Sequence, residues 1–131
     1  MADQPRYVEP LVTKDLAKKM VLLAGPRQVG KTTLARRLPG GAQGYLNWDV
    51  AEDRERILKR EYPSSPLWVF DELHKYRRWR NYLKGLFDGR DPAQQILVTG
   101  SGRLDAYRFG GDSLQGRYHF WRLHPLSVAE L

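Results

Sequence analysis

The sequence GPRQVGKTT, residues 25–33, constrains the fold more than any other part of this 131-residue chain. It follows the short apolar run MVLLA and precedes LARRL, so it lies where a strand would pass directly into a helix. Glycines there let backbone N–H groups turn inward toward an anion, and a helix N-terminus adds positive partial charge. The spacing G-x-x-x-x-G-K-[ST] adds a lysine for the terminal phosphates and a hydroxyl for Mg²⁺. A glycine turn with a solvated lysine is the alternative, but the strand-to-helix context favours a phosphate-binding loop.

Short apolar runs and helical patterns alternate along the rest of the chain. The expected strands are residues 20–24, 67–71, 95–99 and 118–123, with a weaker one at 44–49. The expected helices are residues 31–38, 51–60 and 73–87, with a looser stretch from Arg103. The runs MVLLA, LWVFD and QILVT are nearly continuous, as expected for parallel strands covered on both faces, whereas YHFWRL alternates like an edge strand. This order predicts a doubly wound α/β sheet, and the chain length suits one domain.

The run LWVFDE ends in two adjacent carboxylates, Asp71 and Glu72. Hydrolysis of a bound nucleotide needs a carboxylate for Mg²⁺ at a neighbouring strand end and a group that activates the attacking water. Because the strand ends here, Asp71 can face the metal while Glu72 faces the water. The alternative is that Asp71 caps a helix beginning at Leu73. The phosphate-binding loop upstream favours the catalytic interpretation.

The same part of the chain distinguishes ATP from GTP. A GTPase switch would read D-x-x-G after the aspartate, but this chain reads DELH. The sequence NWD at residues 47–49 also lacks the lysine of the N-K-x-D motif that reads guanine. ATP is therefore the expected nucleotide.

The segment ILVTGSG places the hydroxyls of Thr99 and Ser101 at the end of another expected strand. Either hydroxyl could lie near the γ-phosphate or the attacking water. A strand-to-loop turn that needs glycines explains the same pattern, since small hydroxyl residues are common in loops. The residues alone leave these two interpretations open.

The chain is basic, with a net charge of +7 and an isoelectric point near 9.9, which implies attraction to polyanions. The segment KYRRWRNYLK, residues 75–84, concentrates this charge. It could contact nucleic acid, with Tyr76 or Trp79 stacking on a base. The alternative is an amphipathic helix whose aromatic residues pack on the sheet while its cations face water.

Composition excludes several other classes of protein. With 41% apolar and 28% charged residues, the chain has the composition of a folded globular domain. No apolar run approaches the ~20 residues of a membrane helix, and MADQPRYVEP lacks the layout of a secretory signal. The absence of cysteine excludes disulfides and thiolate metal sites. These features together favour the cytoplasm.

Four segments, taken in order, resemble a known family: LAGPRQVGKTTLARRL, WVFDELHKYRRWRNYLKGLFD, ILVTGSGRLD and GRYHFWRLHPLSVAEL. They look like the AAA-like ATPases of bacteria and archaea whose P-loop typically reads GPRQVGKTT. Many NTPases share the P-loop, whereas the later motifs are more specific, and the resemblance covers nearly the whole chain. Members usually continue into further helices and a separate C-terminal domain. We therefore expect residues 1–131 to be a P-loop ATPase core, the N-terminal part of a longer protein.

The resemblance implies a three-layer RecA/AAA-type fold whose mostly parallel sheet of about five strands has the order 5-1-4-3-2. It implies ATP and Mg²⁺ as cofactors, with Thr32 and Asp71 at the metal and with Glu72 and Lys31 as catalytic residues. It also implies that Arg117 is catalytic, as an arginine finger directed toward a neighbouring subunit. The implied nucleotide-binding residues are Gly25, Pro26, Arg27, Gln28, Val29, Gly30, Lys31, Thr32, Thr33 and Ser101.

We therefore predict a Mg²⁺-dependent ATPase module that turns over slowly as this chain alone, because its finger would come from a neighbour in a homo-oligomer. The alternative is a nucleotide-gated DNA-binding or assembly switch with little turnover. Glu72 supports the first prediction and the positive charge supports the second. Arg117 could instead cap a strand or pair with Asp112, and Arg103 and Arg108 lie close to it in the sequence. Lys31 is expected to be a surface cation when no phosphate is bound.

Overall fold

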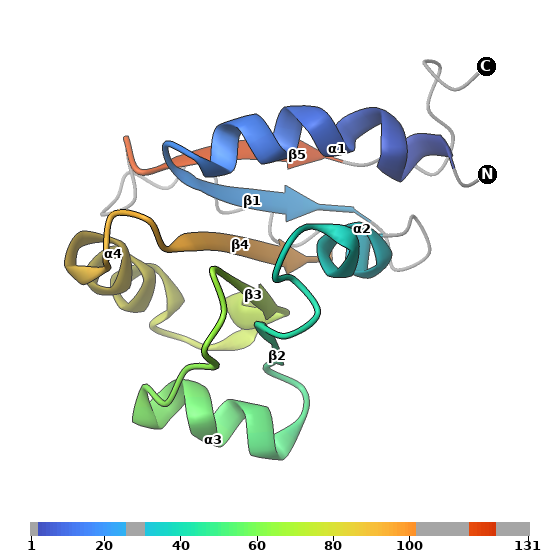
Figure 1. Ribbon diagram of the computed structural model, residues 1–131. Coiled ribbons are helices and arrows are strands. Elements are labelled where there is room, and N and C mark those ends of the chain that lie inside the picture. The colour runs from blue at the N-terminus through green and yellow to red at the C-terminus, as the bar shows by residue number, and fades with distance from the viewer. Residues whose placement is uncertain (1–2, 26–30, 102–115, 123–131) are drawn as a thin grey trace.

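Five strands form one sheet in the computed structural model, which describes residues 3–25, 31–101 and 116–122, with side chains from residue 9 onward (Figure 1). The strands are β1 (Met20–Ala24), β2 (Tyr45–Asn47), β3 (Leu67–Asp71), β4 (Gln95–Gly100) and β5 (Tyr118–Arg122). Their order is β2-β3-β4-β1-β5, and every neighbouring pair is parallel. The predicted α/β class is confirmed, and the predicted order 5-1-4-3-2 is the same sheet named from its other edge.

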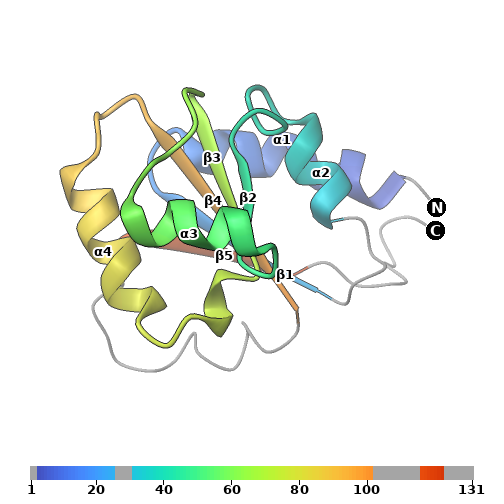
Figure 2. The same cartoon turned by 90° about the horizontal axis from the view of Figure 1, so that it is seen from below.

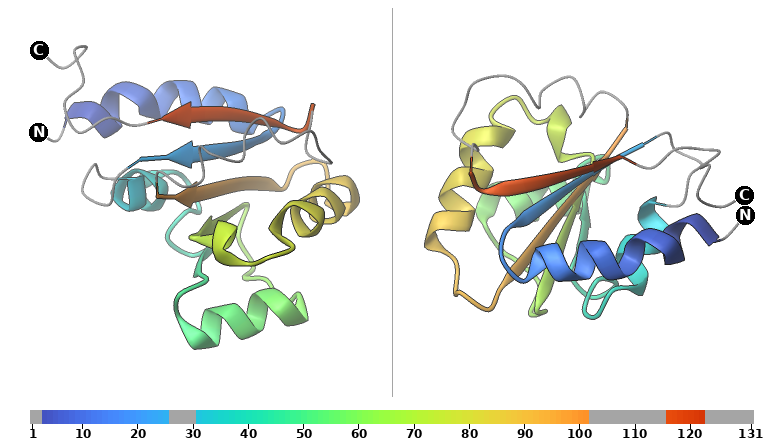
Figure 3. Two further views of the ribbon diagram at one scale, coloured as in Figure 1. Left: turned by 180° about the vertical axis from the view of Figure 1, so that it is seen from behind. Right: turned by 90° about the horizontal axis from the view of Figure 1, so that it is seen from above.

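Helices cover both faces of this sheet and give the molecule three layers (Figures 2 and 3). The helices α1 (Asp3–Leu16) and α2 (Lys31–Arg37) lie on one face, and α3 (Ala51–Lys59) and α4 (Trp79–Gly89) lie on the other. All five residues of β1 are buried, as its continuous apolar sequence indicated. Each large apolar side chain buried in these two cores contributes about 1.5–3 kcal/mol. The side chains that fill the cores include Val12, Leu23, Leu34 and Leu97 beside α1 and α2, and Leu22, Ile57, Phe70 and Leu83 beside α3 and α4.

The helix α1 has no counterpart among the expected elements. Pro10 lies inside it, and its sequence is mostly polar, so the helical periodicity is weak. Two apolar residues one turn apart, Val12 and Leu16, are buried against the sheet. Tertiary packing therefore stabilises a helix that local propensity does not predict.

A partly buried carboxylate, that of Asp15, links the end of α1 to the edge strand β5. The indole Nε1 of Trp121 donates to Oδ2 of Asp15 over 2.7 Å, and Nδ1 of His119 lies 3.0 Å from the same oxygen. Burial opposes the ionisation of Asp15, but these two contacts outweigh it and lower the pKa of the carboxyl group. The carboxylate is therefore charged at neutral pH and links two segments far apart in the sequence.

The expected helix at residues 73–87 is wrong at its start, because two elements occupy this stretch. A short 3₁₀ turn, η2 (Leu73–Lys75), comes first, and α4 follows it. Tyr76 between them is extended, with φ −78° and ψ 124°. Its ring stacks on Trp48 with the ring centroids 4.8 Å apart. The backbone is therefore extended at Tyr76, where the sequence pattern predicted a continuous helix, and the tyrosine ring packs on Trp48.

The amphipathic interpretation of residues 75–84 holds for α4. Trp79 is 4% exposed and packs in the core with Tyr82 and Leu83, so the suggestion that Trp79 stacks on a nucleic-acid base is wrong. Arg77 and Arg78 are exposed in the turn before α4. None of the described helices combines the length and apolarity needed to cross a bilayer. The looser helical stretch expected from Arg103 lies outside the described residues.

Candidate nucleotide-binding site

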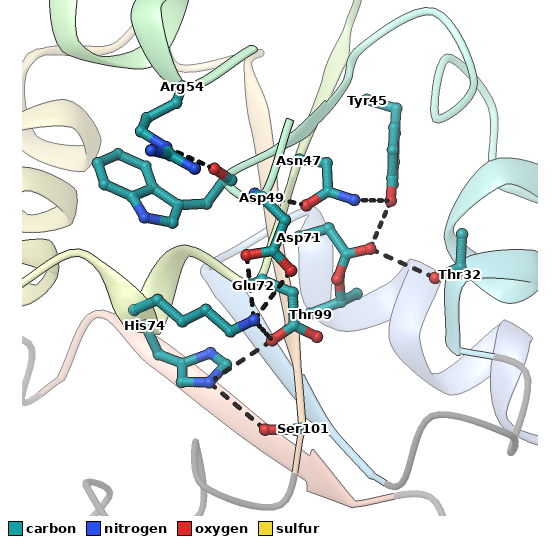
Figure 4. Close-up of polar contacts among 12 residues, drawn as sticks. Thr32, Tyr45, Asn47, Asp49, Arg54, Asp71, Glu72, His74, Thr99 and Ser101 are labelled. Atoms are coloured by element: carbon teal, nitrogen blue, oxygen red, sulfur yellow. Dashed lines mark hydrogen bonds and ion pairs between the residues drawn. The ribbon is translucent and has the colours of Figure 1, made fainter. Parts of the chain in front are cut away.

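The carboxyl ends of β1, β3 and β4 bring the predicted site residues to one edge of the sheet (Figure 4). Gly25 follows β1, is buried, and donates its backbone N–H to the carbonyl of Gly100 over 3.2 Å. Asp71 ends β3 in register with Thr99 of β4. Because ligands of open α/β sheets bind outside the carboxyl ends of the strands, this edge is the candidate site.

The helix α2 begins with two of the predicted residues. Lys31 is 3% exposed, so the expectation that it is a surface cation is wrong. Thr32, next to it, is partly buried, and Thr33 is exposed. The remaining predicted residues of the phosphate-binding loop, residues 26–30, lie outside the described residues.

The carboxylate of Asp71 accepts hydrogen bonds from three hydroxyl groups. Thr99 Oγ1 donates to Oδ1 over 2.8 Å, and Thr32 Oγ1 lies 3.4 Å from Oδ2. The hydroxyl of Tyr45 donates to the same Oδ2. The residue at the N-cap of the following turn is Glu72, and its side chain makes no capping hydrogen bond. Asp71 is therefore directed into the site, and the capping role considered for it is not observed.

The pair of Thr32 and Asp71 fits a magnesium ion by its chemistry. A hydroxyl and a carboxylate are hard oxygen ligands, and their oxygens already lie side by side. Mg²⁺ in nucleotide sites uses one or two carboxylates and the substrate phosphates rather than a cage of protein ligands. Residues 3–25, 31–101 and 116–122 contain no group of three His, Cys, Asp or Glu side chains that could hold a metal by themselves.

Glu72 lies beside this pair in a strained backbone conformation. Its φ of 63° and ψ of 21° are in the left-handed region, which is uncommon for residues with a side chain. Its backbone N–H donates to the carbonyl of Thr99 over 2.8 Å, and the residue is 9% exposed. Oε1 lies 3.6 Å from His74 Nε2 and 3.7 Å from Lys75 Nζ. The backbone thus holds a second carboxylate next to Asp71, within reach of the Lys75 ammonium group and the His74 imidazole.

Burial raises the pKa of Glu72, and the neighbouring Asp71 carboxylate raises it further. The positive charges of Lys75 and Lys31 act in the opposite direction but do not cancel the rise. A carboxylate whose pKa moves toward neutrality becomes a better proton acceptor near neutral pH. This property suits a residue that takes a proton from water.

The two hydroxyls of the ILVTGSG segment have different neighbours. Thr99 is fully buried against Asp71, whereas Ser101 Oγ lies 3.4 Å from Nε2 of His74. His74 in turn faces Glu72, so Ser101 is connected to the predicted catalytic carboxylate through one imidazole (Figure 4). The nucleotide-binding role predicted for Ser101 stays a prediction.

Arg117 lies at the opposite edge of the sheet from this site. It immediately precedes β5, and its carbonyl accepts the backbone N–H of Met20 at the start of β1. Its guanidinium contacts Asp88 at the end of α4, with Nε 2.9 Å from Oδ1 and Nη2 3.2 Å from Oδ2. Asp112, the partner considered from the sequence, lies outside the described residues. The finger role stays a prediction, and this position requires that it act on another subunit.

Sequence reasoning did not identify Tyr45 as a site residue. Gly44, just before it, lets β2 approach β3 closely, because a Cβ there would lie 1.8 Å from the carbonyl oxygen of Leu67. The register then pairs Asn47 with Asp71 and brings the Tyr45 hydroxyl to the carboxylate. The sequence did offer one indication, the weak strand GYLNWD. If this strand lies parallel to LWVFD, as it does here, the two strands end side by side.

Comparisons with known proteins agree with this geometry. A protein-family model described as an AAA domain matches residues 17–131. The chain is similar to the structure of a DNA polymerase III gamma subunit-related protein from Thermotoga maritima, with a TM-score of 0.53 and 13% identity over 98% of this chain and 47% of that chain. It is also similar to a chain in a structure of two Pif1 helicases at forked double-stranded DNA, with a TM-score of 0.48 and 12% identity over 97% of this chain and 44% of that chain.

These likenesses have a limited meaning. At 13% identity, the similarity to the Thermotoga maritima protein shows the fold alone. This chain spans less than half the length of either solved protein, at 47% and 44%. No relative was found among curated protein sequences.

Proposed function

Because this chain belongs to the AAA domain family, we propose that it binds ATP together with Mg²⁺ and hydrolyses the bond between the β- and γ-phosphates. The observation that carries this proposal is the contact between Thr32 at the start of α2 and Asp71 at the end of β3. It joins the helix that follows the phosphate-binding sequence to a carboxylate held in place by Thr99. A second carboxylate, Glu72, follows directly.

The proposed binding step uses residues 25–33 and the end of β3. Backbone amides of the loop and the ammonium group of Lys31 hold the phosphates, and the Thr32 hydroxyl and the Asp71 carboxylate hold the cation. Bound Mg²⁺ would neutralise the charge that develops on the phosphate oxygens. Ser101 lies near the same edge of the sheet and completes the proposed nucleotide-binding set.

The proposed hydrolytic step uses Glu72 as the base. Its carboxylate removes a proton from the attacking water as that water approaches the γ-phosphate. The raised pKa of Glu72 supports this role, because it increases the driving force for proton transfer. Arg117 of a neighbouring copy of the chain would stabilise the charge on the transferring phosphoryl group.

Lys31→Ala tests the binding step, and we expect it to weaken Mg-ATP affinity by about 100-fold. The lysine contributes charge-assisted hydrogen bonds to phosphate, which are worth about 1.5–3 kcal/mol. Isothermal titration calorimetry measures the affinity. Lys59→Ala, which removes an exposed lysine of α3, is the matched control.

Lys31 is 3% exposed, and replacing a buried side chain affects stability. The thermal unfolding temperature of both variants therefore has to be measured together with their Mg-ATP affinity. Lys31→Met keeps most of the aliphatic part of the side chain. It replaces Lys31→Ala in this test if the alanine variant does not fold. A folded variant with unchanged Mg-ATP affinity would show that the phosphate-binding assignment is wrong.

A nucleotide-gated DNA-binding switch is the second candidate, favoured by the net charge of +7 and by the exposed Arg77 and Arg78. These two arginines follow Glu72 and η2 closely in the chain. This candidate predicts that the chain shifts DNA in a gel more strongly with ATP than without it at low salt, and less at high salt. Arg77→Ala combined with Arg78→Ala should then weaken the shift. Absence of a shift at low salt excludes the candidate.

A further inference from the structure

Tyr45 reaches the proposed metal site from β2, an element that the binding step does not otherwise use. Its hydroxyl donates to Oδ2 of Asp71, the same oxygen that faces Thr32 Oγ1 at 3.4 Å (Figure 4). The other oxygen, Oδ1, accepts from Thr99 over 2.8 Å. Hydrogen bonds from two flanking strands therefore hold the two ends of one carboxylate.

The Tyr45 side chain is itself held from several directions. Asn47 Nδ2 donates to its hydroxyl over 3.3 Å, and the Arg36 guanidinium lies 4.7 Å from the centre of its ring. Asn47 is fixed in turn, because its Oδ1 accepts the backbone N–H of Asp49 over 2.9 Å. These contacts fix the Tyr45 side chain of β2 in place beside the end of β3.

The Tyr45 hydroxyl is the donor in its contact with Asp71, because an ionised carboxylate can only accept. A neutral phenol donates one hydrogen bond. A carboxylate oxygen has about two acceptor sites, so Oδ2 can keep this bond while its other side faces Thr32.

We propose that Tyr45 is a positioning residue that makes the metal site selective for Mg²⁺ over Ca²⁺ by holding the Asp71 carboxylate in one orientation. Mg²⁺ demands nearly ideal octahedral geometry and takes a single oxygen from a carboxylate in such sites. Ca²⁺ accepts six to eight oxygens in looser geometry and often binds both oxygens of a carboxylate. For Ca²⁺ to bind both oxygens, the Asp71 carboxylate would have to rotate and lose its hydrogen bonds to Tyr45 and Thr99. The proposal rests on the proposed function, since it concerns the cation that accompanies ATP.

The test compares the affinities of Mg-ATP, Ca-ATP and metal-free ATP for the wild-type chain and for Tyr45→Phe by calorimetry. Phenylalanine keeps the ring and removes only the hydroxyl. Groups that orient a metal ligand typically change metal affinity by about 10- to 100-fold when they are removed. We expect Mg-ATP affinity to fall by about 10-fold, Ca-ATP affinity to fall much less, and metal-free ATP affinity to stay unchanged. Tyr62→Phe, which removes a half-buried hydroxyl bonded to Tyr82 instead, should leave all three affinities unchanged.

Each outcome decides the question. An unchanged ratio of Mg-ATP to Ca-ATP affinity in a folded Tyr45→Phe variant overturns the inference and leaves the proposed function intact. An equal loss for metal-free ATP also overturns it, because it would mean a general structural role. A wild-type chain that binds no nucleotide overturns the proposed function and this inference together. If Tyr45→Phe does not fold, Asn47→Ala, which removes the donor to the Tyr45 hydroxyl, must lower the same ratio, and an unchanged ratio there overturns the proposal.

Discussion

Glu72→Gln is expected to slow ATP hydrolysis by about 10²- to 10⁴-fold, the range that a positioned general base contributes. Glutamine has nearly the same shape as glutamate and keeps a hydrogen-bonding oxygen, but it cannot accept the proton from the attacking water. Mg-ATP affinity should therefore stay nearly unchanged. Single-turnover release of phosphate measures the rate, and calorimetry measures the affinity.

The pH dependence provides a second measurement on the same variant. The base acts only when it is deprotonated, so the wild-type rate should fall as the pH falls through the pKa of Glu72. Burial raises that pKa, which moves this loss of activity to higher pH than an ordinary glutamate would give. The residual rate of Glu72→Gln should lack this dependence.

Two further variants separate catalysis from metal binding. Asp71→Asn should weaken Mg²⁺-dependent affinity, because the neutral amide is a poorer ligand for the cation. Glu61→Gln, which changes an exposed glutamate, should leave both rate and affinity unchanged. If Glu72→Gln and Asp71→Asn gave the same phenotype, the separate roles assigned to the two carboxylates would be wrong.

Hydrolysis per subunit is expected to rise with protein concentration, and Arg117→Ala is expected to abolish that rise. An arginine finger can contribute about 10³- to 10⁵-fold to the rate. Arg117 lies before β5, whereas its own site lies beyond the opposite ends of the strands, so the proposed finger would have to act on the site of a neighbour. Dilute protein should bind ATP and turn it over slowly. Phosphate release measured over a concentration series tests this, together with the affinity of each variant, which should change little.

Asp88→Ala is the matched control for this variant. It removes the ion pair with the Arg117 guanidinium while leaving the arginine in place. An exposed pair of this kind contributes little to stability, so the Asp88→Ala variant should stay folded. If the ion pair were the whole role of Arg117, Asp88→Ala would reproduce the loss of rate. A fast rate that is independent of concentration and insensitive to Arg117→Ala would mean that one chain contains a complete site.

The sequence predicted the strands well because the sheet is buried on both faces. The expected runs at 20–24 and 67–71 coincide with β1 and β3, since continuous apolar segments bounded by glycine, proline and charged residues have few alternatives. Parallel strands have their carboxyl ends at one edge, which is why Thr32 and Asp71 could be expected to meet. The topology predicts that the two residues lie near each other, and the structure adds the hydrogen bond between their side chains.

The features that were missed depend on tertiary contacts. Pro10 and a polar sequence obscure α1, whose stability comes from two buried residues and from the Asp15 contacts with β5. The break before α4 depends on the stacking of Tyr76 on Trp48, which are far apart in the sequence. Tyr45 depends on the register of a three-residue strand, and no local pattern specifies that register.

The link between Asp15 and the pair of Trp121 and His119 bears on where the folding unit begins. The family match starts at residue 17, so the whole of α1 precedes the part of the chain that family members share as a recognisable pattern. Yet Val12 and Leu16 cover one face of the sheet, and Asp15 braces its outermost strand. A protein that began at residue 17 would lack α1. One face of its sheet would then be exposed to solvent, and β5 would lose its contacts with Asp15. The segment that sequence comparison would discard is therefore a structural part of the domain.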